Sequence, residues 1–283
     1  MSHFSVLAIQ RKGSKQTIRS LLEPYDENLE VEPRIYKTKQ ELIDEEKSRL
    51  PGIINEDIVK EYLADPVKFK KEESSYKVNY VEKVLDEYYK FAAGSFTDED
   101  YYRSAIEDED PDHFDEDGNL MTTYNEDSKW DWYEVGGRWS GELILKNGST
   151  ADSAKFEDVD WAAMNKLSPD HEKDIRDYWR LIINKKGTDE EVKQFKDDHP
   201  FMPSERYVVE KYGTLEEHLR IAGLFSTFAV VDEKGWYEEG RMGWFGASSA
   251  TPEEEANWTE DYEKNFIAGL DPEDKITVVD CHI

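Results

Sequence analysis

Two similar stretches of the chain combine residue types that bind ligands: Lys129–Gly141 (KWDWYEVGGRWSG) and Gly235–Gly246 (GWYEEGRMGWFG). Each runs from Trp-Tyr-Glu through a glycine and an arginine to a final Trp-x-Gly, with one residue inserted in the second copy. Aromatic rings provide flat apolar faces, glycine lets another group approach the backbone, and arginine offers a planar fork of donors. The pattern therefore predicts a binding surface.

The predicted surface is a cleft in which tryptophan rings stack on a base or another ring while arginine holds an anionic group. A nucleotide or a nucleotide-derived signal has both a ring that can stack and an anionic phosphate. Two alternatives stay open: the rings can be core residues beside glycine bends of a sheet, or the surface can be a protein interface. The residues assigned to this surface are Trp130, Trp132, Tyr133, Gly136, Gly137, Arg138, Trp139, Trp236, Arg241, Gly243 and Trp244.

A second group with catalytic potential lies at the end of the sequence. Asp280 and His282 are two residues apart in a segment that reads as a strand, so their side chains share one face. A carboxylate that orients an imidazole is the basic unit of general acid–base catalysis. His3 joins this pair if the first and last strands are neighbours. The alternative is a solvent-facing histidine at a chain end, without chemistry.

The sequence gives little indication of a metal or a cofactor. Asp115–Leu120 resembles the middle of a calcium loop, but His113 and Tyr124 occupy its first and last ligand positions, so a hairpin turn is the better interpretation. The histidines lack zinc-binding spacing, and the single cysteine, Cys281, cannot form a thiolate site. Walker A and GxGxxG sequences are absent. We therefore expect no cofactor.

The elements that must position these residues indicate an α+β protein. Apolar runs predict strands over 4–10, 276–283 and 225–231, the last turning back into the second aromatic stretch. The segment 130–145 predicts a hairpin that turns near Gly136 and Gly137, or a strand interrupted by a glycine kink. Apolar spacing and capping residues predict helices over 11–22, 38–50, 55–63, 79–92, 158–183, 188–198, 214–222 and 251–270.

We expect one domain, residues 1–283, with a mixed or antiparallel sheet whose core contains the N- and C-terminal strands. The largely helical and acidic segment 35–127 is predicted to be an insertion or subdomain. Within it, Asp98–Asp117 contains 11 acidic residues and one basic residue, which indicates an exposed acidic loop with or without a short helix.

Composition limits the classes of function. The formal net charge of −29 disfavours direct binding to nucleic acid or to an anionic membrane, because both present phosphates. Aromatic residues make up 13% of the chain, which argues against disorder. No segment approaches the ~20 apolar residues of a membrane span, and one cysteine allows no intrachain disulfide. We expect a cytoplasmic protein.

Several motifs resemble those of a family of uncharacterised bacteriophage and prophage proteins. These are Tyr25–Asn28 (YDEN), Lys129–Tyr133 (KWDWY) with Gly136–Trp139 (GGRW), Met242–Gly246 (MGWFG) and Val279–His282 (VDCH). The resemblance spans nearly the whole chain. It implies a viral protein that acts in the cytoplasm of an infected bacterium, on a host enzyme or on host immunity, and it implies no catalytic residues.

Three hypotheses of function result. The leading one is a binding protein that inhibits or sequesters a host component, either a host protein or a nucleotide-like small molecule, through the paired Trp/Gly/Arg motifs, in counter-defence for example. The second is a nucleotide-processing hydrolase that uses Asp280 and His282. The third is an inhibitor that imitates DNA with the carboxylates of Asp98–Asp117.

Overall fold

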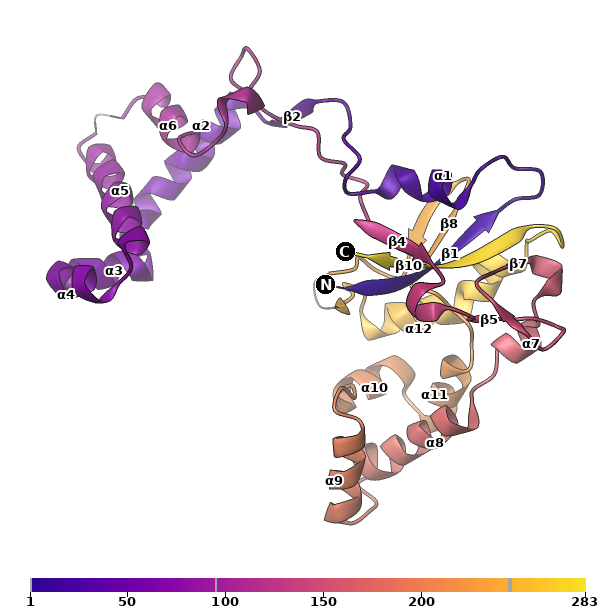
Figure 1. Ribbon diagram of the computed structural model, residues 1–283. Coiled ribbons are helices and arrows are strands. Elements are labelled where there is room, and N and C mark those ends of the chain that lie inside the picture. Colours follow the sequence, from indigo (N-terminus) through magenta and orange to yellow (C-terminus); the bar gives the residue numbers. More distant parts are fainter. Residues whose placement is uncertain (1, 95, 244–245) are drawn as a thin grey trace. The chain divides into compact units, whose positions relative to one another are not determined.

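The computed structural model describes residues 2–94, 96–243 and 246–283, and its fold is α+β, as predicted. The chain divides into two compact units (Figure 1). Residues up to Leu29 together with Asn125–Ile283 form the first unit, and Glu30–Tyr124 forms the second. The segment 35–127 thus lies largely within the second unit. Each unit has a hydrophobic core of its own.

A mixed sheet forms the centre of the first unit. Its strands are β1 (His3–Gln10), β4 (Trp132–Val135), β7 (Ser153–Lys155), β8 (Ala229–Asp232), β9 (Gly235–Glu238) and β10 (Lys275–His282). The strand order is β4-β10-β1-β8-β9, and β7 also pairs with β10. β1 runs antiparallel to β10 and parallel to β8. The first and last strands therefore lie in the middle of the sheet, which confirms the prediction.

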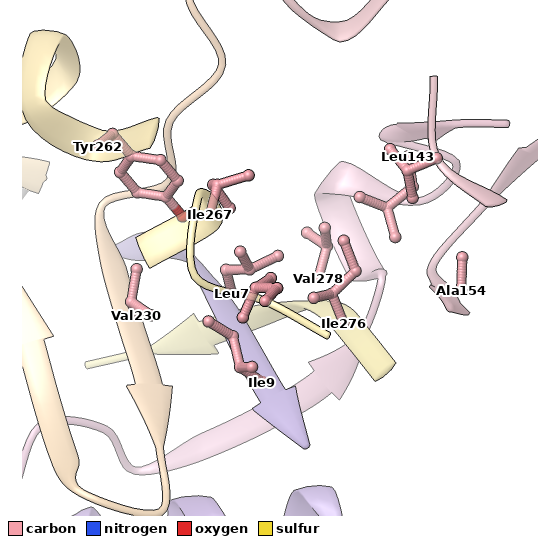
Figure 2. Packing of buried hydrophobic residues seen from close by; sticks show 11 residues of the cluster. Leu7, Ile9, Leu143, Ala154, Val230, Tyr262, Ile267, Ile276 and Val278 are labelled. Carbon is pink, nitrogen blue, oxygen red and sulfur yellow. The ribbon is translucent and has the colours of Figure 1, made fainter. Parts of the chain in front are cut away.

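Both faces of the sheet are covered, which is why β1 and β10 are nearly continuous apolar runs. On one face Leu7 and Val278 pack against Tyr262, at the end of α12 (Pro252–Tyr262) (Figure 2). On the other face Val6 packs with Leu22 of α1 (Ile18–Leu22). The fully buried hydroxyl of Tyr262 lies 2.6 Å from Thr227 Oγ1, so this core tyrosine has a polar partner.

The glycine pair after β4 ends the strand and does not turn a hairpin. Gly136 has a φ of +75°, and a 3-10 turn, Gly137–Trp139, follows it. β5 (Leu143–Ile144) then pairs with β6 (Thr150–Ala151) and not with β4. Of the two alternatives for 130–145, the hairpin is therefore wrong.

Helices α1 and α12 cover the two faces of the sheet, whereas the helices over residues 169–222 pack together in a cluster of their own, and several helices begin later than predicted. The predicted helix 11–22 is helical only from Ile18, because Thr17 caps it in a capping box with Ser20. Pro169 begins a new helix, which divides the predicted helix 158–183. The remaining helices of this unit are α7 (Trp161–Met164), α8 (Pro169–Tyr178), the π-helical turns Trp179–Ile183 and Glu263–Ile267, α9 (Asp189–Asp198), α10 (Glu205–Tyr212) and α11 (Leu215–Ala222).

The second unit is mainly helical. Its elements are β2 (Arg34–Lys37), α2 (Lys39–Arg49), α3 (Asp57–Ala64), α4 (Pro66–Glu72), α5 (Ser75–Ala92), α6 (Asp98–Ala105) and β3 (Leu120–Thr122), which pairs with β2. Ser74 caps α5, so this helix begins before the predicted Asn79. Val81 and Leu85 of its apolar stripe are buried in the core, as the helical spacing indicates.

The acidic stretch Asp98–Asp117 has many of its carboxylates engaged within the unit. Lys47 Nζ lies 2.7 Å from Asp98 Oδ1, and Lys83 Nζ lies 3.0 Å from Glu107 Oε2. Asp115 accepts hydrogen bonds from the backbone of the turn that follows it, and Phe114 and Leu120 pair across this turn. The turn interpretation is thus confirmed, and fewer carboxylates are left to imitate phosphates.

A partly buried ion pair connects α10 with α12. Lys211 Nζ lies 2.6 Å from Glu255 Oε2, which the Tyr207 hydroxyl also contacts. Burial, with a smaller contribution from the negative charge of Glu255, raises the pKa of Glu239 to about 7, and Lys211 opposes this shift. Glu239 immediately follows β9. At alkaline pH two carboxylates therefore share the positive charge of one lysine.

We expect Glu239→Gln to stabilise the protein at pH 8 more than at pH 5. An acid whose pKa is higher in the folded state lowers stability as the pH rises from its unfolded value through its folded value. Allowing for partial exposure, the gain in the free energy of unfolding should grow by about 1–2 kcal/mol between these pH values. Urea unfolding at both values measures it, and an equal effect at both would contradict the assignment.

Candidate functional site

Strand register brings chemically active side chains together at one end of the sheet. His3 lies opposite His282, and His282 lies opposite Trp132 on its other side. Asp280 is on the same face of β10 as His282, and Asp131 immediately precedes β4. We call this group the His–Asp site: His3, Asp131, Trp132, Asp280 and His282.

Each histidine of the site pairs with an aspartate that is not on its own strand. His3 Nδ1 lies 2.9 Å from Asp280 Oδ1, and His282 Nδ1 lies 2.6 Å from Asp131 Oδ1. Asp280 thus orients His3 and not His282, contrary to the pairing expected from the sequence. His3 and Asp280 are diagonal neighbours across the paired strands β1 and β10. Diagonal neighbours are about 7–8 Å apart, a separation that long or aromatic side chains can bridge.

The aspartates also determine which ring nitrogens carry hydrogen. An ionised carboxylate only accepts hydrogen bonds, so Nδ1 of each histidine is the donor and Nε2 of a neutral ring presents a lone pair. His282 is only 4% exposed, and its buried Nε2 has no hydrogen-bond partner among the described residues. A buried polar atom without a partner is costly. This nitrogen therefore points to a ligand or a reaction.

The rings of the site pack directly against one another. The ring centroids of His3 and His282 are 5.0 Å apart, with an angle of 75° between the planes. Trp132 stacks on His282 at 5.2 Å and 20°. Trp132 is nevertheless 44% exposed, so the indole covers the buried imidazole and still offers ring surface to a ligand.

The backbone of the first aromatic motif holds the carboxylate of Asp280. The Arg138 N–H donates a hydrogen bond of 3.0 Å to Asp280 Oδ2. Gly137 permits this approach, because it has a φ of +54° and a Cβ atom there would lie 2.4 Å from the Asp280 side chain. A Cβ atom at Gly136 would likewise lie 2.5 Å from the side chain of Asp152. The glycines thus admit the chain's own carboxylates to the backbone, and not a ligand.

The aromatic residues of the first motif lie on both faces of the sheet. Trp130 is buried with Tyr133 on the face opposite the His–Asp site, and its Nε1 donates to Leu22 O at 3.2 Å. Trp139 is partly buried against the other core. Of the four rings, Trp132 alone belongs to the site, while Trp130 matches the alternative of a core residue.

The second motif is not a spatial copy of the first. Its strand β9 and the strand β4 stand at opposite ends of the strand order. Trp236 packs against Phe4 and Tyr25, on the face opposite the His–Asp site, and its Nε1 donates to Glu238 Oε2 at 2.9 Å. Trp132 and Trp236 consequently do not line one cleft.

The loop after β9 does approach the site. The Ser2 hydroxyl, next to His3, donates to Gly243 O at 3.0 Å and accepts from Gly246 N at 2.7 Å. Arg241 is exposed, and its N–H donates to Ser249 Oγ. Trp244, the other tryptophan assigned to this motif, lies outside the described residues. The loop backbone is therefore the part of the second motif that borders the site.

Sequence reasoning missed Asp131 as a functional residue. Asp131 stands between two tryptophans of the motif, and this position at the start of an aromatic strand could have indicated its role. A shallow pocket of about 350 Å³ beside it shares Asp131 and Trp132 with the site. Arg19, Glu23 and Asp26 contribute the polar side chains on its other side. Trp130 and Tyr133 of the opposite face complete its lining, so the pocket meets the His–Asp site only through Asp131 and Trp132.

Comparisons with protein-family models, with curated proteins and with solved structures give no match to this chain. Among the described residues, no three His, Cys, Asp or Glu side chains are placed to hold a metal ion. In the same part of the chain, no helix has both the length and the apolar character needed to cross a membrane. The function must therefore be argued from the geometry of the site.

We expect Gly137→Ala to destabilise the fold more than Gly148→Ala. Both positions have positive φ, but a Cβ at Gly148 has nothing within 4 Å, whereas one at Gly137 collides with Asp280. Backbone strain should cost each variant about 1 kcal/mol, and the collision should cost Gly137→Ala about 2 kcal/mol more. Urea unfolding measures both free energies; equal losses would mean that Asp280 does not need the close approach.

Proposed function

We propose that this chain binds a nucleotide-like phosphoester at the His–Asp site and hydrolyses it by general acid–base catalysis. The observation that carries this proposal is the contact between two aspartate-oriented histidines, one of which has a buried Nε2 without a partner among the described residues. Acid–base hydrolysis needs one group to take a proton and another to give one, and two adjacent imidazoles supply both.

In the proposed reaction the ligand displaces the side chains that bury His282 Nε2. This nitrogen then takes a proton from the water molecule that attacks the phosphorus. The bond from phosphorus to the leaving oxygen breaks, and the Nε2 proton of a protonated His3 passes to that oxygen. Asp131 and Asp280 hold the rings in the required tautomers through hydrogen bonds of 2.6 and 2.9 Å. The histidines exchange their protons with solvent before the next turnover.

Two neighbours of the histidines suit a nucleotide. The exposed face of Trp132 offers a stacking surface for a base. Arg138 is exposed, and its guanidinium forms no ion pair among the described residues. It is therefore free to meet a phosphate despite the negative charge of the chain. With the phage setting that the resemblance implies, we propose a host nucleotide or nucleotide-derived signal as substrate and counter-defence as the purpose.

A second candidate is a binding protein that sequesters a host component at the same face and breaks no bond. The exposure of Trp132 and the shallow pocket beside Asp131 favour this alternative. Its contact face would include Trp132 and the mouth of this pocket, which Trp130 and Tyr133 also line, whereas Trp236 packs in the core of the other face.

We expect hydrolysis of thymidine 5′-p-nitrophenyl phosphate, and loss of it in His282→Asn. Asparagine can keep the hydrogen bond to Asp131 but has no atom at the position of Nε2. The substitution should lower kcat by about 100-fold or more, the usual contribution of a general base. Trp132→Ala should raise KM more than it lowers kcat. Release of p-nitrophenol measures both constants.

The matched control is His113→Asn, an exposed histidine of the second unit, which should leave kcat unchanged. Absence of turnover by the purified chain, with the nucleotide still bound in a Trp132-dependent manner, would refute hydrolysis of this ester and favour sequestration. Equal loss in the control and in His282→Asn would show that the assay reports stability and not chemistry.

A further inference from the structure

A cavity of about 450 Å³ lies among helices α8–α11, away from the His–Asp site. These helices form the salmon and orange part of the chain in Figure 1. Most of the cavity wall is apolar and comes from residues such as Ile175, Phe195, Met202 and Val208. Cavities of this size and character commonly take small organic ligands. Three histidines also reach this wall, and their hydrogen bonds define the polarity of the cavity.

His218 is held as a neutral ring that keeps one donor free. Its Nδ1 lies 2.9 Å from Trp179 Nε1, and an indole N–H is only a donor, so Nδ1 accepts and Nε2 carries the hydrogen. The ring stacks on Tyr212 with centroids 3.8 Å apart and planes 6° apart. Burial, and then the charges of His171 and Lys211, lower the pKa of His218 to about 4. The ring is therefore uncharged at neutral pH.

Two other polar side chains of the wall, those of His199 and Tyr178, already have partners. His199 Nδ1 donates to Phe195 O at 2.9 Å, and its Nε2 lies 3.6 Å from Asp174. The Tyr178 hydroxyl donates to Pro203 O at 2.8 Å. The ring of His171, the third histidine of the wall, is exposed. Among the less exposed side chains that line the cavity in the described part of the chain, the Nε2 hydrogen of His218 is thus the donor that remains for a ligand.

The rim of the cavity carries a large apolar side chain in solvent. Phe201, in the loop between α9 and α10, is 97% exposed, and its neighbours Met202 and Pro203 also line the cavity. A fully exposed phenyl ring next to an apolar cavity is an unfavourable arrangement that a flat ligand would relieve by covering the ring.

We propose that this cavity binds a neutral, planar aromatic compound that carries one hydrogen-bond acceptor. Its ring system fills the apolar space between the helices and packs under Phe201, and its acceptor receives the Nε2 hydrogen of His218. A charged ligand is disfavoured, because the wall around His218 is apolar and His218 itself is neutral. This site is separate from the His–Asp site and does not depend on the function proposed for it.

The test uses quinoline, which has a ring nitrogen as acceptor, and naphthalene, which has the same shape without one. Binding of both to the full chain is followed by NMR through the backbone N–H resonances of Ile175 and Val208, which line the cavity. His218→Phe keeps a ring against Tyr212 but removes the donor, and it also leaves the Trp179 N–H without its acceptor. It should weaken quinoline binding about fivefold, the value of one hydrogen bond, and leave naphthalene unchanged.

Phe201→Ala is the second variant and concerns an exposed side chain, so the fold does not depend on it. It should weaken both probes by at least about twofold. Val67→Ala, which removes an apolar side chain that is 80% exposed in the second unit, should change neither. Failure of both probes to shift the Ile175 and Val208 resonances would overturn the site. Equal weakening of quinoline and naphthalene by His218→Phe would overturn the assigned ligand chemistry.

Discussion

The pairing of the first strand with the last is the constraint that sets the geometry of the whole first unit. β1 and β10 pair over eight residues, from His3 opposite His282 to Gln10 opposite Lys275. A shift of one residue would move every side chain of one strand to the other face. The apolar positions of both strands exclude such a shift, because Leu7 and Val278 must face one core and Val6 and Val279 the other.

The same register creates the site at the end of the sheet. Because the apolar residues fix the register, they also determine which polar residues are neighbours at the strand ends. His3 meets Asp280 diagonally, and His282 is enclosed between His3 and Trp132. The core that stabilises the fold and the group that performs the proposed chemistry thus share one set of backbone hydrogen bonds.

The acidic residues that give the chain its negative charge have different partners in different parts of the structure. In the second unit Lys39, Lys47 and Lys83 pair with acids of the stretch Asp98–Asp117, and exposed pairs of this kind contribute little to stability. At the site the partners are different. Asp131 and Asp280 accept hydrogen bonds from histidines, and the nearby Asp152 accepts one from the backbone N–H of Gly141. Net charge alone therefore says little about the character of the site.

Local signals in the sequence were enough to predict the fold class, the central place of the terminal strands and the common face of Asp280 and His282 on the last strand. These signals are apolar runs, capping residues and side-chain alternation. The three-dimensional arrangement was needed to show that Asp280 forms a hydrogen bond with His3 and that Asp131 forms one with His282. It was also needed to show that Trp132 and Trp236 lie on opposite faces of the sheet. The reason is that strand order and register join residues far apart in the chain, and no local pattern in one sequence encodes which strands become neighbours.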